Sequence, residues 1–166
     1  MAPDARSIAP AGPAWQIAPV RLLGLDVGSR RIGVALTDDL LVAAHALVVL
    51  DRRGTRLDTE EIVRLCRKHE VSLVVVGLPV DPDGEPGHRA ARVRVLTQSL
   101  ADAGLSVDEC DEQFSTVEAE ETLLEADLSR SKRKRFIDRA AAQVILTRYL
   151  AEHPELREPS PPANNP

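Results

Sequence analysis

Short apolar runs alternate along the chain with longer stretches in which apolar residues recur at helical spacing. Two runs, residues 22–27 and 32–36, flank the turn sequence Gly28-Ser29-Arg30, and a third covers residues 46–50. Short apolar runs joined by turn residues predict three sequential antiparallel strands, of which the first two form a hairpin. The unbroken run at 73–76 is typical of a strand buried on both faces, and residues 105–111 predict a last strand.

The remaining periodic segments predict helices over residues 58–69, 88–103, 116–126 and 136–152. Ser115-Thr116-Val117-Glu118 is a capping-box sequence that begins the third of these helices, and Gly104 ends the second. Strands and helices in this order predict an α/β domain. We expect a five-stranded mixed sheet, an antiparallel meander plus two parallel strands, with helices on both faces.

Composition restricts the class of protein. The chain has 166 residues, 43% of them hydrophobic, which suits one folded domain over residues 21–153. Proline-rich residues 1–20 and 154–166 have no period, so we expect a disordered arm and tail. No apolar run approaches the roughly 20 residues that span a bilayer, so no membrane contact is expected. Cys66 and Cys110 lack the spacing of a zinc site or a disulfide framework, which favours a cytoplasmic protein with two buried thiols.

Charge and aromatic content limit how the chain could bind nucleic acid. The net charge is −5, so contact with a polyanion needs a local basic patch. Only 2% of the residues are aromatic, which argues against recognition by stacking of bases. Five of the seven residues from Ser129 to Arg135 are positive, and they directly precede Asp138. This run is either an exposed, charged linker before the last helix or a surface that brings phosphates to nearby carboxylates.

Asp26 is an anomaly, because it interrupts an apolar strand and strands are depleted in aspartate. A buried carboxylate needs either a protein partner or a cation. Ligands of α/β sheets collect at the carboxyl ends of the parallel strands. Asp26, either Asp111 or Glu112, and Asp138 could meet there, although Asp138 at the start of a helix is also favourable through the helix dipole.

Clustered carboxylates repel one another, so such a group is stabilised by a cation. Two like charges 4 Å apart repel by roughly 4 kcal/mol near a protein surface. Carboxylate oxygens without histidine or cysteine favour hard ions, here Mg²⁺ or Mn²⁺. Two such ions can activate a water molecule and stabilise the leaving oxygen of a phosphodiester.

Four stretches resemble one family, the YqgF/RuvX-type proteins of the RNase H-like superfamily. The first two are Leu23-Gly-Leu-Asp-Val-Gly-Ser-Arg-Arg-Ile-Gly-Val-Ala35 and Val75-Val-Gly-Leu-Pro79 with Asp83-Gly84. The others are Asp111-Glu-Gln-Phe-Ser-Thr-Val-Glu-Ala119, and Ile137-Asp138-x-x-Ala-Ala with Ile145-Leu146-x-x-Tyr149-Leu150. The similarity covers residues 21–151 and implies an RNase H-like fold. Gln113 departs from the family pattern, which usually has Arg there.

The resemblance also implies an activity. It assigns Asp26, Glu112 and Asp138 as metal-binding catalytic carboxylates, with Asp111 as the alternative to Glu112, and links the chain to Holliday-junction resolution and to 5′-end maturation of pre-16S rRNA. We therefore expect a Mg²⁺- or Mn²⁺-dependent nuclease acting on structured RNA or branched DNA. The expected backbone contacts are Arg30, Arg31, Arg130, Lys132, Arg133, Lys134 and Arg135.

Other interpretations stay open at this point. A non-catalytic module could bind structured nucleic acid through the basic run alone. Gly-x-Asp-x-Gly before an apolar strand also resembles the phosphate-binding hairpin of actin-like ATPases, but this chain could supply only one of the two lobes that close on ATP. The sequence does not choose between DNA and RNA. A resolvase acting on a two-fold symmetric junction would need a homodimer.

Overall fold

The computed structural model describes residues 20–80, 87–111 and 130–157, with the backbone alone for residues 130, 133–136 and 138. Its elements in chain order are β1 (Arg21–Val27), β2 (Arg31–Thr37), β3 (Ala44–Asp51), α1 (Thr55–Lys68), β4 (Val71–Leu78), α2 (His88–Asp102), β5 (Val107–Asp111), α4 (Arg130–Glu152) and a 3-10 helix, η3 (Pro154–Arg157).

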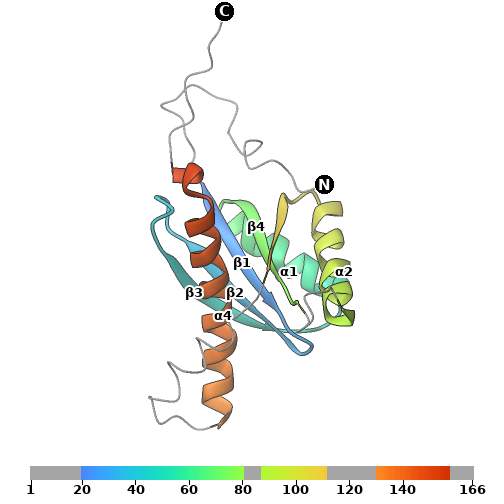
Figure 1. The fold of residues 1–166 in the computed structure, drawn as a ribbon. Helices are drawn as coiled ribbons and strands as arrows, with labels where there is room; N and C mark the ends of the chain where they lie inside the picture. The colour runs from blue at the N-terminus through green and yellow to red at the C-terminus, as the bar shows by residue number, and fades with distance from the viewer. Residues whose placement is uncertain (1–19, 81–86, 112–129, 158–166) are drawn as a thin grey trace, which may run out of the picture.

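The five strands form one mixed sheet in the order β3-β2-β1-β4-β5. β1, β2 and β3 pair antiparallel, whereas β4 pairs parallel with both β1 and β5. Helices α1 and α2 cover one face of the sheet and α4 crosses the other (Figure 1). The predicted architecture is therefore confirmed: an antiparallel meander extended by two parallel strands, with helices on both faces.

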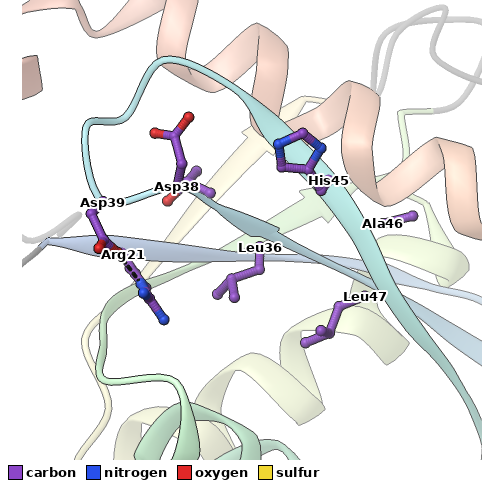
Figure 2. Close-up of a pocket in the computed structure, with 8 residues that line it drawn as sticks. Arg21, Leu36, Asp38, Asp39, His45, Ala46 and Leu47 are labelled. Atoms are coloured by element: carbon purple, nitrogen blue, oxygen red, sulfur yellow. Dashed lines mark hydrogen bonds and ion pairs between the residues drawn. The ribbon is translucent and has the colours of Figure 1, made fainter.

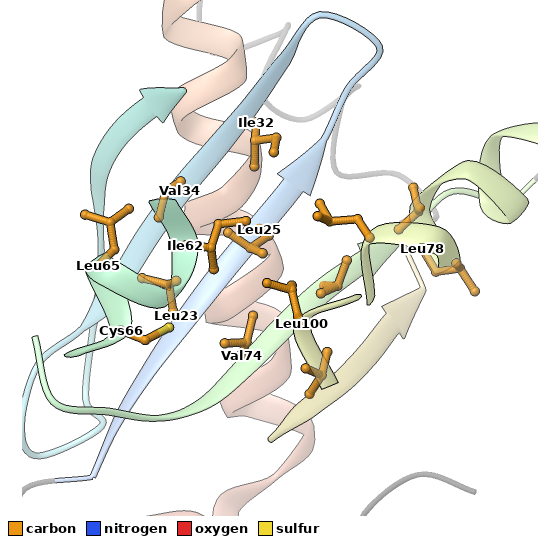
Figure 3. Packing of buried hydrophobic residues seen from close by; sticks show 14 of the residues in the cluster. Leu23, Leu25, Ile32, Val34, Ile62, Leu65, Cys66, Val74, Leu78 and Leu100 are labelled. Carbon is orange, nitrogen blue, oxygen red and sulfur yellow. The ribbon is translucent and has the colours of Figure 1, made fainter. Parts of the chain in front are cut away.

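Alternation along the strands builds a separate apolar core on each face. On the α1/α2 face, Leu23 and Leu25 of β1 pack with Ile62 of α1 and Leu100 of α2 (Figure 3). On the other face, Leu22 packs with buried residues of α4, which are Ala142, Ile145, Leu146, Tyr149 and Leu150. β4 contributes to both cores, as its unbroken apolar run predicts.

The last helix begins earlier than its apolar period suggests. α4 starts at Arg130, so the basic run at 130–135 forms its first turns rather than a linker before it. Arginine and lysine are good helix formers, and their charge hides the apolar period that sequence reading relies on. The predicted helix at 116–126 lies outside the described residues.

The first four residues of the predicted C-terminal tail are folded. Pro154 to Arg157 form η3, whose Leu156 packs against the core of the α4 face. The Arg157 guanidinium donates a 2.7 Å hydrogen bond to the carbonyl oxygen of Leu41. Among the described residues, no helix combines the length and the apolar character that crossing a membrane requires.

Candidate active site

The carboxyl ends of four strands lie at one edge of the sheet. Leu25 of β1 is in register with Val76 of β4, and Leu78 of β4 with Asp111 of β5. β3 runs in the same direction as β1, because both are antiparallel to β2, and it ends where Asp51 pairs with Arg31. This carboxyl edge is where an α/β sheet binds ligands.

Asp26 lies at this edge on the face covered by α4. It is paired with Gly33 of β2, and the next position in register on its other side is Gly77 of β4. Neither neighbour carries a side chain that could pair with the carboxylate. Asp26 is partly buried, and none of the described residues forms a hydrogen bond or an ion pair with its side chain. A carboxylate in this position is suited to holding a cation.

Gly24 brings α4 unusually close to β1. A Cβ atom at Gly24 would lie 3.0 Å from the carbonyl oxygen of Ala142 and 2.5 Å from Cγ of Leu146. Such separations are too short for ordinary contacts, so only glycine permits the observed packing. The α4 backbone at Ala142 thus rests directly on β1, two residues before Asp26.

Position 138 lies one helical turn before Ala142, on the stripe of α4 that also contains Ile145 and Tyr149. β1 and α4 run in roughly opposite directions (Figure 1). Two residues along a strand advance about 6.7 Å, and four residues back along a helix advance about 6 Å. These two distances are similar, so position 138 of α4 lies beside Asp26 of β1. Because α4 begins at Arg130, Asp138 is about two turns inside the helix, too far from its start for the dipole explanation.

Asp111 belongs to the opposite face of the sheet. Tyr149 of α4 donates a 2.7 Å hydrogen bond to the carboxylate of Asp108, and Cys110 packs in the core of the α4 face. Alternation therefore directs the Asp111 side chain away from the face that carries Asp26. Glu112 lies outside the described residues. Among the side chains described, no three potential metal ligands gather at one point.

The predicted basic residues flank this edge. Arg30 is exposed in the turn between β1 and β2, and Nε of Arg31 lies 3.5 Å from the Asp51 carboxylate. The first turns of α4, which carry Arg130, Lys132, Arg133, Lys134 and Arg135, extend beyond the sheet (Figure 1). Lys132 is exposed.

Sequence reading missed a buried carboxylate near the same edge. Asp58, in the first turn of α1, accepts a 2.7 Å hydrogen bond from Nε of Arg52 and a 2.9 Å bond from the backbone N–H of Arg53. Its side chain is only 2% exposed. The sequence signal for a partner of Asp58 was the pair Arg52-Arg53, which precedes a glycine and the helix. An aspartate in the first turn is common in any case, because it interacts favourably with the helix dipole.

A pocket of about 310 Å³ lies at the other end of the sheet (Figure 2). Arg21 and Asp39 form an ion pair at its rim. Asp38 accepts hydrogen bonds from the backbone N–H groups of Leu40, Val42 and Ala43, and these bonds lower the pKa of its carboxyl group. The pocket contains the start of β1 and is therefore remote from the carboxyl edge and from Asp26.

Comparison with known proteins identifies relatives that match this chain over most of their own length. A family model described as "RuvX: Holliday junction resolvase" matches residues 20–152. A Myxococcus xanthus protein named "Putative pre-16S rRNA nuclease" is 42% identical over 135 residues, covering 81% of this chain and 89% of the relative. A relative of the same name from Carboxydothermus hydrogenoformans is 43% identical over 132 residues, covering 79% and 96%.

Solved structures support the fold. RuvC from Thermus thermophilus, in complex with a Holliday junction substrate, aligns with a TM-score of 0.53 at 15% identity, covering 81% of this chain and 96% of RuvC. A fowlpox virus resolvase in complex with Holliday junction DNA aligns with a TM-score of 0.50 at 8% identity, covering 80% and 98%. At these identities the likeness shows the shared fold alone. The match of the family model over residues 20–152 and the 42% identical relative show that the chain belongs to the RuvX family of Holliday junction resolvases.

Proposed function

We propose that this chain is a divalent-metal-dependent nuclease that hydrolyses phosphodiester bonds at the carboxyl edge of its sheet. The observation that carries the proposal is Asp26, a partly buried carboxylate that is flanked by glycine positions and pairs with no described residue. The relatives of this chain are named as nucleases of pre-16S rRNA, and the family model is described as a Holliday junction resolvase. Both reactions cleave the same chemical bond.

Asp26, Glu112 and Asp138 are the carboxylates that would hold the metal. The close contact between Gly24 and α4 supports a position of residue 138 near Asp26. Asp111 is directed to the other face, which leaves Glu112 as the candidate from the end of β5. An all-oxygen ligand set fits Mg²⁺ or Mn²⁺. When bound, these ions supply an activated water molecule and neutralise charge on the leaving oxygen.

The protein's own groups then have separate roles. Asp26 is fixed in a central strand, so its carboxylate is oriented before substrate arrives and loses little freedom on binding. Arg30, Arg31 and the basic first turns of α4 bind the backbone phosphates on either side of the scissile bond. Gln113 replaces the usual arginine of the family, so this chain relies more heavily on those groups for phosphate contact.

Precursor RNA is the substrate we propose first, because the curated relatives carry that name. Cleavage of a 5′-extended ribosomal RNA precursor and of a four-way DNA junction should be compared in Mg²⁺ and in Mn²⁺. We expect the wild type to cleave at least one substrate and Asp26→Asn to cleave neither while keeping its fold. Asp102→Asn, an exposed substitution at the end of α2, is the matched control and should cleave normally.

Two results would contradict the proposal. Retained turnover by Asp26→Asn would remove the carboxylate from the mechanism. Tight binding without cleavage of either substrate in any metal would instead support a non-catalytic binding module.

If the junction is cleaved symmetrically, sedimentation should show a dimer, since a two-fold symmetric substrate calls for a two-fold symmetric enzyme.

A further inference from the structure

A second basic surface lies beside the turn between β1 and β2. The backbone N–H of Arg52 donates a 2.8 Å hydrogen bond to the carbonyl oxygen of Arg30. Nη1 of Arg52 donates a 3.0 Å bond to the carbonyl oxygen of Gly28. The segment after β3 is thus bonded to the turn that follows β1, and these bonds bring together three residues that we name the arginine platform: Arg30, Arg52 and Arg53.

Asp58 fixes the position of the arginine platform through hydrogen bonds. It is the one charged residue that is buried among those described. Its two carboxylate oxygens accept bonds from Nε of Arg52 at 2.7 Å and from the backbone of Arg53 at 2.9 Å. Charge-assisted bonds of this kind offset the cost of burying a carboxylate. Asp58 therefore fixes both the side chain of Arg52 and the chain direction at Arg53.

The outer groups of the platform remain available for a ligand. Arg30 and Arg53 are exposed, and no hydrogen bond or ion pair of either guanidinium occurs among the described residues. Arg53 exerts a weak attraction on Glu61, but that carboxylate is hydrogen-bonded to Arg64. The planar donors of a guanidinium group match the oxygens of a phosphate.

The platform lies at the same edge of the sheet as Asp26. β3 ends at this edge, two strand positions from β1. Neighbouring strands are about 4.8 Å apart, so the separation across the sheet is about 10 Å. One nucleotide of a strand in a duplex advances about 3.4 Å along the axis. Arg52 and Arg53, which follow β3, are therefore about three nucleotides from a bond positioned at Asp26, whereas Arg30 lies in the turn directly after β1.

We propose that the arginine platform binds backbone phosphates of the nucleic acid within about three nucleotides of the cleaved bond, with Asp58 as its positioning residue. This inference rests on the proposed nuclease function and adds to it Arg52, Arg53 and Asp58, to which the sequence analysis gave no role. The contact is with phosphate, so it acts equally on RNA and DNA.

Binding should be measured without turnover, with metal removed by chelation, on a short DNA duplex and an RNA duplex of the same sequence. The test variant is Arg53→Ala, because Arg30 is already among the phosphate contacts of the proposed nuclease site. The matched control is Arg67→Ala, which removes the same charge from an exposed position in the last turn of α1. The slope of log affinity against log salt should decrease in magnitude by about 0.9 for the test variant on DNA. The control variant should keep the wild-type slope.

The Asp58→Asn variant distinguishes the positioning role of Asp58 from the effect of its negative charge on binding. This change removes a negative charge beside the platform, so electrostatics alone would strengthen binding. Loss of positioning would weaken it, and we expect the affinity and the salt slope both to fall at a temperature where the variant is folded. Tighter binding by Asp58→Asn would overturn its role.

The remaining outcomes distinguish the platform from the catalytic site. If the wild type cleaves nucleic acid but Arg53→Ala binds like Arg67→Ala, the arginine platform is wrong and the nuclease function stands. If the wild type neither binds nor cleaves any of these nucleic acids, both proposals fall.

Discussion

Gly24 of β1 faces Ala142 of α4 so closely that a methyl group at Gly24 would lie 3.0 Å from the Ala142 carbonyl oxygen. We predict that Gly24→Ala pushes α4 away from β1 and destabilises the protein by about 1–3 kcal/mol. Cleavage should fall as well, because α4 carries Asp138. Thermal unfolding and cleavage rates measure the two effects.

A second substitution tests whether crowding is the cause. The Cγ atom of Leu146 would lie only 2.5 Å from the added methyl group, so Leu146→Ala makes room for it. The double variant should be more stable than the sum of the two single effects predicts. Strict additivity would mean that Gly24 matters for another reason.

The two acidic residues at the end of β5 should differ in effect. Asp111 is exposed and directed to the face opposite Asp26, so Asp111→Asn should change the cleavage rate less than about threefold, well under the 10²–10⁴ typical of lost catalytic groups. Glu112→Gln should abolish cleavage as thoroughly as Asp26→Asn. Equal losses from both substitutions, with folding intact by circular dichroism, would contradict this assignment.

Both thiols should be inert in the folded protein. Burial raises the pKa of Cys66 and of Cys110 to about 11. Thiolate is the reactive form, so a thiol reagent at about pH 8 should label neither residue until the chain unfolds. Mass spectrometry before and after adding denaturant checks this, and rapid labelling of either cysteine in the native protein would refute it.

Asp38 should make the stability of the protein depend on pH. Three backbone N–H groups hold its folded pKa below the unfolded value of about 3.9. A depressed pKa contributes stability that is present above the unfolded value and is lost as the pH falls through the folded value. The difference in unfolding free energy between wild type and Asp38→Ala should therefore shrink on acidification below about pH 4. A difference that stays constant would exclude this contribution.

The sheet and its central carboxylate were predictable because each leaves a local pattern. Short apolar runs joined by turn residues mark β1 and β2, and Asp26 is conspicuous in an apolar strand. The contacts of Asp58 were not predictable, since a first-turn aspartate has the same sequence signature whether it faces solvent or bonds to a neighbouring arginine. Asp111 could be assigned to the face opposite Asp26 only when the alternation of β5 was known, because shifting by one residue exchanges the two faces.

The early start of α4 has a thermodynamic consequence. Its basic first turns place positive charges at the end of a helix whose dipole is already positive, an arrangement that costs about 0.3–1 kcal/mol for each exposed charge. A bound polyanion removes that cost, so substrate and helix end stabilise each other. The melting temperature of this protein should consequently rise with the concentration of the nucleic acid that it binds, even when no bond is cut.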